Sequence, residues 1–443
     1  MECISAISTA PGTGGVAIIR ISGDNALSIA AKMFRPLGNK TDVLNFEPYR
    51  MYVGEIDAAD FTDKGMCVFF KAPKSFTGEN VVELHCHGGE AIAHGILERT
   101  FACGARPATN GEFTKRAFLN GKLSLSSCEG LIDMINGESV AQIKSGFYLF
   151  KEKLKNHIEN VQSVLTDILA GIDANIDYPE EGLISDNGDE IKQKLIKVKA
   201  GLEELISSYA SGKIVTNGVK VALVGKTNTG KSSLLNTLTG EQRAIVTDVA
   251  GTTRDVVEGS LQINGIKFAL YDTAGIRETD DPVELLGIKR SDDLIRSADV
   301  ILYVTDGTET KQDEELFKSK LEDKKIIFIR NKSDLGIEYD DNNGILISCL
   351  TGKNIDKLKS ELYTAAAGDV RTDSGFITEK RHYYALKDAL ICIENAISAM
   401  DNQPLDLIAY DIKECWEKLG EITGTTASES IIDEIFSKFC VGK

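Results

Sequence analysis

The spacing of hydrophobic and polar positions changes several times along the chain. Up to about residue 117, apolar residues come in short runs, such as 16–21, 66–70 and 81–87, separated by turn residues. Five of the eight prolines lie at or before Pro107. Short apolar runs bounded by glycine and proline are typical of strands. The pattern predicts an N-terminal α+β domain over residues 1–117.

Helical spacing follows. Between residues 118 and 212, apolar side chains recur every three or four positions along 143–168 and again along 191–205, with a break at 178–181. After residue 373 the same spacing returns in two stripes, and Thr426 to Glu429 has the spacing of a capping box. Because each block is small for a bundle, we expect one discontinuous helical domain, 118–212 and 374–443. Two independent bundles are the alternative.

The segment between the helical blocks, 213–373, carries apolar runs that each end in a polar loop. Gly225 to Ser232 reads G-x-x-x-x-G-K-S and follows the run 219–224. Glycines let the backbone of such a phosphate loop direct its N–H groups at phosphate oxygens. Lys231 would then reach the β- and γ-phosphates, and the Ser232 hydroxyl would hold Mg²⁺.

Three further loops follow in the order that a guanine-nucleotide hydrolase needs. They are Asp272 to Gly275 after the run 268–271, Asn331 to Asp334 after 326–329, and Ser348 to Leu350 after 345–347. A carboxylate at Asp334 accepts the two donors of guanine, which adenine lacks. Ligands of open α/β sheets bind at the carboxyl ends of the strands. We therefore predict an inserted Ras-like P-loop α/β G domain, 213–373, that binds GTP.

The residue that orients the attacking water is less apparent from the sequence. Ile276 follows the Asp-Thr-Ala-Gly loop, where Ras-like enzymes carry a glutamine that orients water. The acidic residues just beyond, Glu278, Asp280, Asp281 and Glu284, are candidates to act through a bridging water.

A second requirement is a cation for the charge on the phosphates. Thr253, in the first switch, is a natural Mg²⁺ ligand. Arg254 is a candidate arginine finger in cis, with a structural ion pair as the alternative. The side-chain carbonyl of Asn228, with switch carbonyls, would suit a monovalent cation instead. The residues alone leave these alternatives open.

Composition limits the binding partners and the cellular compartment that we expect for the protein. The 443 residues carry a formal net charge of −17, which argues against a chain whose whole surface binds nucleic acid. Nine scattered cysteines without a C-x-x-C pair fit a reducing cytosol. Neither a secretory signal nor an apolar run of 18 residues is present, so we expect a cytoplasmic protein without a membrane span.

Two further groups of residues suggest chemistry: a possible zinc site at 85–87, which we discount, and a possible nucleophile at Cys440, which stays open. In a strand, His85 and His87 share a face with Glu83, whereas Cys86 points the other way, so these residues do not converge on zinc. Cys440 is a candidate nucleophile toward C6 of a uridine. The alternative, which we prefer, is a motif cysteine that shapes the C-terminal tail.

Several motifs outside the G domain carry a resemblance that covers nearly the whole chain. They are 11–15, 20–23, 75–79, 87–89, 111–120 and the terminal 440–443. With them the chain resembles the MnmE (TrmE) family of tRNA modification GTPases. The resemblance implies a folate-binding N-terminal domain that forms a homodimer. It also implies a complex, heterotetrameric or larger, with the FAD-binding partner MnmG (GidA), and G domains that pair in the GTP state.

The activity implied is addition of an aminomethyl or carboxymethylaminomethyl group to C5 of the wobble uridine of certain tRNAs. The one-carbon unit would come from 5-formyl- or 5,10-methylene-tetrahydrofolate. The alternative is a GTP-dependent switch in ribosome or RNA-complex assembly, which has no use for folate-type residues such as Arg20, Glu83 and Lys122.

Residue roles follow from the resemblance by position. It assigns K⁺ to Asn228, Thr247, Val249 and Thr252, and Mg²⁺ to Ser232 and Thr253. It selects Glu284 as the residue that orients water, with Lys231 and Thr253 as the other catalytic residues, and it makes K⁺ replace an arginine finger. Folate contacts fall on Arg20, Glu83, Lys122 and Lys443. The expected GTP contacts are Asn228, Thr229, Gly230, Lys231, Ser232, Ser233, Thr247, Asp248, Val249, Ala250, Gly251, Thr252, Thr253, Asp272, Thr273, Ala274, Gly275, Asn331, Lys332, Asp334, Ser348, Cys349 and Leu350.

One departure lies in the phosphate loop. The family often has a proline before the asparagine, where this chain has Thr227. Since the asparagine, the glycines and the lysine are intact, we expect little change.

Overall fold

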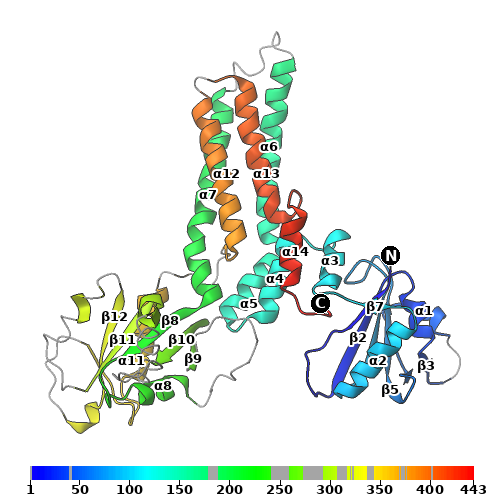
Figure 1. The fold of residues 1–443 in the computed structure, drawn as a ribbon. Coiled ribbons are helices and arrows are strands. Elements are labelled where there is room, and N and C mark those ends of the chain that lie inside the picture. Colours follow the sequence, from blue (N-terminus) through cyan, green and yellow to red (C-terminus); the bar gives the residue numbers. More distant parts are fainter. Residues whose placement is uncertain are drawn as a thin grey trace, which may run out of the picture. The chain divides into compact units, whose positions relative to one another are not determined.

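The structure is a computed structural model (Figure 1) that describes residues 2–38, 42–177, 188–240, 259–272, 293–306, 317–319, 321, 324–336, 344–368, 370, 375, 377–400 and 403–443. The chain packs as two compact units. The first comprises Met1–Ile132, Gly146–Val198 and Asp388–Lys443, and the second comprises Asp133–Ser145 and Lys199–Lys387. Each unit is described by itself.

The N-terminal part of the first unit is built on a seven-stranded sheet in the order β3-β4-β5-β6-β2-β1-β7. Neighbouring strands are antiparallel, except that β1 pairs parallel with β7. The strands are β1 (Ile4–Ile7), β2 (Val16–Ser22), β3 (Phe34–Pro36), β4 (Met51–Asp57), β5 (Thr62–Phe70), β6 (Val81–His87) and β7 (Arg106–Pro107).

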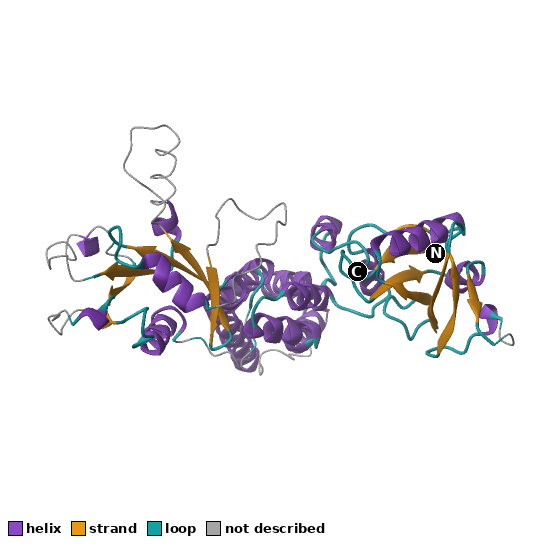
Figure 2. Ribbon diagram, turned by 90° about the horizontal axis from the view of Figure 1, so that it is seen from below, coloured by secondary structure: helices purple, strands orange, loops and turns teal. Residues whose placement is uncertain are grey.

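The two faces of this sheet are covered differently. Alternate residues such as Ile19 and Leu84 are fully buried with α1 (Ala26–Ala31) and α2 (Glu90–Ala102), and Figure 2 shows helices lying against these strands. On the opposite face, Phe113 of α3 (Glu112–Leu119) packs on β1. Because side chains alternate along a strand, the polar residues of β2 and β6 lie on this second face.

Helices from the two helical segments of the chain, before and after the G domain, pack together. Helix α6 (Lys153–Asp177) lies against α13 (Leu405–Thr423), and Gln162 Nε2 donates a hydrogen bond to the Trp416 carbonyl at 2.9 Å. The other helices are α4 (Leu125–Asn136), α5 (Val140–Phe150), α7 (Gly188–Asn217), α12 (Lys380–Ala399) and α14 (Glu429–Ser437). The predicted discontinuous helical domain is confirmed, and independent bundles are excluded. The exact domain boundaries remain predictions.

The second unit holds a six-stranded sheet in the order β13-β12-β11-β8-β10-β9, parallel except for the β9–β10 pair. The strands are β8 (Val219–Val224), β9 (Gly259–Ile263), β10 (Ile266–Asp272), β11 (Val300–Thr305), β12 (Lys325–Arg330) and β13 (Ile345–Leu346). Helices α8 (Lys231–Thr239) and α11 (Ile355–Ala367) share its core. The predicted P-loop α/β fold is thus confirmed.

This topology sets the position of the site. Since β8, β10, β12 and β13 are parallel, their carboxyl ends meet at one edge of the sheet. No described helix is long and apolar enough to cross a membrane.

Candidate functional site

The phosphate loop joins β8 to α8, and its backbone depends on residues that tolerate unusual angles. A Cβ atom at Gly225 would lie 2.1 Å from the Val304 carbonyl oxygen, so only glycine fits there. Asn228 and Gly230 have φ values of 64° and 95°, in the left-handed region. Thr229 Oγ1 closes the loop by donating to the Lys226 carbonyl at 3.0 Å. The loop therefore has the curled shape that cradles phosphate.

Lys231, the lysine predicted to be catalytic, is held inside this loop. Lys231 is only 4% exposed, and its Nζ donates to the carbonyls of Gly225 at 2.7 Å and Lys226 at 2.6 Å. Next to it, Ser232 Oγ donates to Asp272 Oδ2 at 2.9 Å, which brings the end of β10 to the start of α8. A hydroxyl and a carboxylate oxygen are hard ligands, so this pair fits Mg²⁺.

The loops predicted to recognise the base are tied to the phosphate loop by one buried side chain. Asn331 Nδ2 donates to the Thr229 carbonyl at 3.1 Å, and Asn331 Oδ1 accepts the Cys349 N–H at 3.2 Å. A Cβ at Gly230 would come within 2.3 Å of Asn331 Nδ2. Asn331 therefore links three loops.

The carboxylate predicted to recognise guanine is also positioned. Ser348 Oγ donates to Asp334 Oδ1 at 2.6 Å. Lys332 adopts φ 62° at the cap of the short helix Ser333–Leu335, and its Nζ pairs with Asp306 Oδ2 at 2.8 Å. Leu335, a neighbour that the sequence analysis did not anticipate, is 65% exposed beside this carboxylate. It offers an apolar edge to a flat base.

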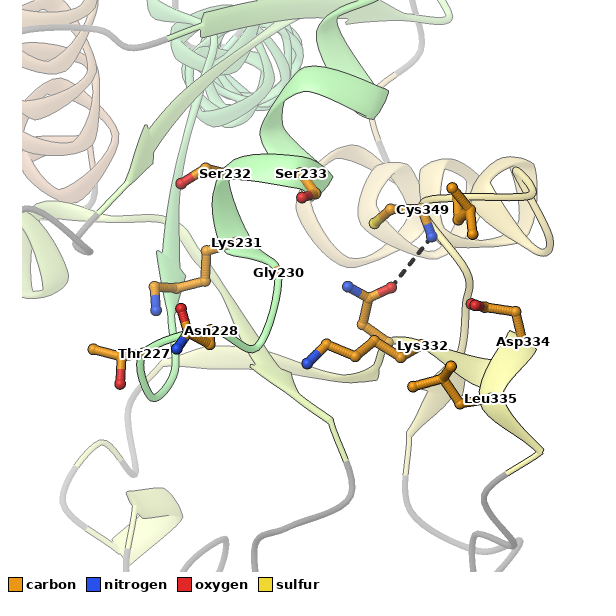
Figure 3. A pocket seen from close by; sticks show the side chains of 12 residues that line it. Thr227, Asn228, Gly230, Lys231, Ser232, Ser233, Lys332, Asp334, Leu335 and Cys349 are labelled. Atoms are coloured by element: carbon orange, nitrogen blue, oxygen red, sulfur yellow. Dashed lines mark hydrogen bonds between the residues drawn. The ribbon is translucent and has the colours of Figure 1, made fainter.

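These loops enclose a pocket of about 740 Å³, large enough for a nucleotide (Figure 3). Figure 3 shows Asn228, Lys231 and Ser232 on one side of the pocket and Asp334, Leu335 and Cys349 on the other. The lining residues are Thr227, Asn228, Gly230, Lys231, Ser232, Ser233, Asn331, Lys332, Asp334, Leu335, Cys349 and Leu350. Burial raises the pKa of the Cys349 thiol, so we expect it to line the pocket as an unreactive thiol.

Part of the predicted site lies outside the described residues. This applies to Thr247, Asp248, Val249, Ala250, Gly251, Thr252, Thr253, Arg254, Thr273, Ala274, Gly275, Ile276, Glu278, Asp280, Asp281 and Glu284. The structure therefore places one predicted K⁺ ligand, Asn228, and one predicted Mg²⁺ ligand, Ser232, together with Asp272.

A second polar cluster lies on the N-terminal sheet, on the face covered by α3. Arg20 and Glu83 are register partners on β2 and β6, and Arg20 Nε lies 2.9 Å from Glu83 Oε1. The Arg20 guanidinium sits 5.6 Å from the Phe76 ring centre and 5.7 Å from that of Phe113. These two aromatic neighbours were not anticipated from sequence.

The charge state of Glu83 is set by its neighbours. Burial by itself would raise the Glu83 pKa, but the nearby His85 and Arg20 outweigh it and hold the pKa below its ordinary value. His85 Nε2 lies 3.4 Å from Glu83 Oε2, and this long contact is the largest of the effects that lower the Glu83 pKa. Glu83 is thus an anion, with one oxygen bonded to Arg20 and the other in the longer contact to His85.

The C-terminal tail is seated on the same N-terminal domain. Ser8 Oγ donates to the Gly442 carbonyl at 3.0 Å, and Gly111 N–H donates to the Cys440 carbonyl at 3.4 Å. The Cys440 side chain is exposed. The other predicted folate residue, Lys122, donates from Nζ to the Pro73 carbonyl at 3.1 Å, in the loop that carries Phe76.

The motifs that carried the resemblance have a structural role that the sequence analysis missed. Arg116 Nη1 binds both oxygens of Glu79, at 3.2 and 3.0 Å, while Arg116 Nη2 lies 3.0 Å from Glu112 Oε1. Arg106 reaches the same Glu112 oxygen at 2.6 Å. Burial opposes the Glu112 charge, but hydrogen bonds led by Arg106 lower its pKa to about 2. This network joins α3 to the 75–79 loop.

Comparisons with known proteins agree with this architecture. The family model of the GTP-binding protein TrmE N-terminus matches residues 3–122, and that of the MnmE helical domain matches residues 125–440. The tRNA modification GTPase MnmE of Natranaerobius thermophilus is 40% identical over 460 residues, covering 100% of this chain and 99% of its own. That of Clostridioides difficile is 38% identical over 455 residues, with the same coverage.

A crystal structure of a variant of Aquifex aeolicus Era bound to GDP and aluminium fluoride is also similar. It is 29% identical with a TM-score of 0.28, over 39% of this chain and 66% of that one. Because this TM-score is low, the assignment of the fold and the family is based on the strand order of the sheet and on the family matches.

Proposed function

Because the chain belongs to the MnmE family of tRNA modification GTPases, we propose that it is a K⁺-stimulated GTP hydrolase acting on tRNA. It works as a homodimer with the FAD-dependent partner MnmG. Together they add an aminomethyl or carboxymethylaminomethyl group to C5 of the wobble uridine. The observation that supports this proposal is that one chain contains two sites. One is the guanine-nucleotide pocket, and the other is the Arg20–Glu83 cluster of the N-terminal domain, on which the C-terminal tail 440–443 is also bound.

The described residues divide the work of hydrolysis. Lys231, already in place at the centre of the loop, transfers its hydrogen bonds from loop carbonyls to the β- and γ-phosphates. Ser232, Asp272 and Thr253 would hold Mg²⁺. Bound Mg²⁺ neutralises charge that develops on the phosphates. Asp334 selects guanine, because adenine would leave its carboxylate unpaired.

K⁺ takes the place of an arginine finger in this proposal. Asn228 lines the pocket in the left-handed conformation, which presents its side chain beside the phosphate loop. Thr247, Val249 and Thr252 supply the other oxygens. Glu284 orients the attacking water through a bridging water.

The N-terminal cluster is proposed to bind the tetrahydrofolate derivative. A pterin presents adjacent N–H donors, which suit the anionic Glu83, and the Phe76 ring offers an apolar neighbour. The glutamate tail of folate is anionic and suits Lys122 and Lys443. Cys440, exposed on the tail, is well placed to shape this site; a nucleophilic role is the alternative.

The decisive experiment measures GTPase rate against protein concentration in KCl and in NaCl of equal ionic strength. We expect a much higher rate in KCl, rising with protein concentration as G domains pair. A matched variant is Asn228→Gly, which keeps the backbone angle but removes the carbonyl ligand and should abolish the difference between salts. Equal rates of the wild type in both salts would exclude K⁺ and return Arg254 to candidacy.

A further inference from the structure

The segment 138–142, between α4 and α5, packs with the G domain, although its sequence belongs to the predicted helical domain. Residues 133–145 fall in the second compact unit, which also holds the G domain. Ala141 is only 4% exposed and shares the hydrophobic core of the G-domain sheet with Val219 of β8 and Ile266 of β10. The nucleotide pocket uses no residue of this segment. Its contacts with the strands therefore need a separate explanation.

The local sequence gives this segment a defined shape. Ser139 and Gln142 form a capping box at the start of α5. Ser139 Oγ accepts the Gln142 N–H at 3.3 Å, and Gln142 Oε1 accepts the Ser139 N–H at 2.9 Å. The Nε2 of the same Gln142 side chain donates to the carbonyl of Thr216, three residues before β8 begins. The capped helix start is thus bonded to the chain that enters β8.

The segment also binds both strands of the β9–β10 hairpin. Gln262 Nε2, on β9, donates to the Glu138 carbonyl at 2.6 Å, and Lys267, on β10, forms an ion pair with the Glu138 carboxylate. Between the two strands, the Gly265 carbonyl accepts the Ala141 N–H at 3.1 Å. Together with the bond to the residue before β8, these contacts join the amino-terminal ends of β8 and β10.

Strands β8 and β10 lead, at their other ends, to the two described groups of the predicted Mg²⁺ site. The strands are parallel neighbours in a register that places Asp272 beside Leu223. Asp272 ends β10, and its carboxylate lies 2.9 Å from the Ser232 hydroxyl, in the first turn of α8 after β8. A slip of one residue between the strands would displace Asp272 by about 3.3 Å. Mg²⁺ demands near-octahedral geometry with ligands at about 2.0–2.1 Å, so a much smaller shift would weaken its binding.

We propose that the 138–142 segment is a positioning element of the nucleotide site, because it fixes the register of β10 against β8 and so holds Asp272 in place beside Ser232. The inference rests on the proposed function, in which these two residues bind Mg²⁺ with GTP. The ion pair between Glu138 and Lys267 is the adjustable part, since the Glu138 side chain is 60% exposed and can separate without opening the core. The segment continues into α4 and α5, so a movement of these helices that displaces Glu138 would change Mg²⁺ binding in the G domain.

The test titrates Mg²⁺ against two rates of the full-length protein: single-turnover hydrolysis of GTP, and release of a fluorescent GTP analogue that is not hydrolysed. Lys267→Glu places two carboxylates against each other and should separate the hairpin from the segment. We expect the half-saturating Mg²⁺ concentration to rise roughly three- to tenfold in both assays, because an exposed ion pair is replaced by repulsion. Amide hydrogen exchange of residues 138–142 should become faster. Affinity for GDP without Mg²⁺ should not change, since the loops 331–335 and 348–350 are unaltered.

The reversed pair, Glu138→Lys with Lys267→Glu, should restore both the Mg²⁺ requirement and the slow exchange, because the ion pair forms again in the opposite sense. Lys199→Glu is the matched control: it makes the same charge change opposite Glu203 of α7, in the same compact unit, and should behave as the wild type.

Three results would overturn the inference: an unchanged Mg²⁺ requirement in Lys267→Glu, a reversed pair that does not recover, or an equal effect in the Lys199→Glu control. Each of these leaves GTP hydrolysis by the wild type intact, and with it the proposed function. A wild type that hydrolysed no GTP at saturating Mg²⁺ would instead overturn the proposed function, and this inference with it.

Discussion

The seating of the C-terminal tail gives the sharpest test of the N-terminal site, through the substitution Gly442→Ala. Gly442 has φ 97°, and a Cβ atom there would lie 2.1 Å from the Ile7 carbonyl oxygen. That atom is backbone in β1 and cannot move aside. The left-handed angle alone costs about 1–2 kcal/mol for alanine, and the clash adds to it. The hydrogen bond that Ser8 gives the tail contributes only about 1 kcal/mol. The tail should therefore detach from the domain.

The functional consequence follows from Lys443, the next residue. If it binds the anionic tail of folate, detachment removes a charge-assisted hydrogen bond of about 1.5–3 kcal/mol. The affinity for 5-formyl-tetrahydrofolate should then fall roughly 10- to 150-fold, as measured by isothermal titration calorimetry. GTP hydrolysis without tRNA should not change, because the nucleotide pocket is in the other compact unit.

Gly104→Ala is the matched control. Gly104 has φ 116°, but a Cβ atom there meets nothing within 4 Å, so this change introduces backbone strain without a clash. It should leave folate affinity intact. Wild-type folate affinity in Gly442→Ala would refute the reasoning, because it would mean that the tail takes no part in the site.

Three further predictions concern other parts of the molecule. Glu284→Ala should abolish GTP hydrolysis while leaving GTP binding nearly intact in equilibrium titration; loss of binding would indicate a structural role. Asp334→Asn should weaken GTP binding about 10- to 150-fold, measured by competition with a fluorescent guanine nucleotide, since it removes a charged acceptor; an unchanged affinity would contradict guanine recognition by this carboxylate. Glu112→Gln should lower the unfolding temperature at pH 7. Because the folded pKa of Glu112, about 2, is below its ordinary 4.5, its stabilisation is present above pH 4.5 and disappears toward pH 2, so wild type and variant should converge in acid; a constant difference would contradict the ionic role.

Local sequence was sufficient for the G domain because its site is built from strand ends. The residues following β8, β10 and β12 are polar and specific, and parallel pairing brings them to one edge whatever the loops between them do. The same logic does not reveal that Asn331 links three loops. Its bond to Thr229 joins residues 102 positions apart, and no periodic pattern records such a contact.

The tail illustrates the same limit more strongly. Ser8 and Gly442 are 434 positions apart, yet they are hydrogen-bonded. Sequence pattern identifies a terminal glycine, but the need for glycine comes from the Ile7 carbonyl, which only the folded structure places there. The Phe76 and Leu335 side chains were missed for a related reason. An exposed apolar residue is common on any protein surface, and it gains meaning only from the charged group beside it.

A similar ambiguity affects the acidic residues of the N-terminal motifs, and hydrogen-bonding capacity resolves it. Glu79 and Glu83 are four residues apart, and each faces an arginine. Both Glu79 oxygens accept bonds from Arg116, and Ser22 Oγ donates to one of them at 2.7 Å. Glu83 has one oxygen 2.9 Å from Arg20 Nε, while the other has the longer 3.4 Å contact with His85 Nε2. A buried carboxylate that accepts several short bonds stabilises the fold, whereas one that accepts fewer still has capacity for a ligand. This difference, which no motif encodes, favours Glu83 over Glu79 as the residue that meets the pterin.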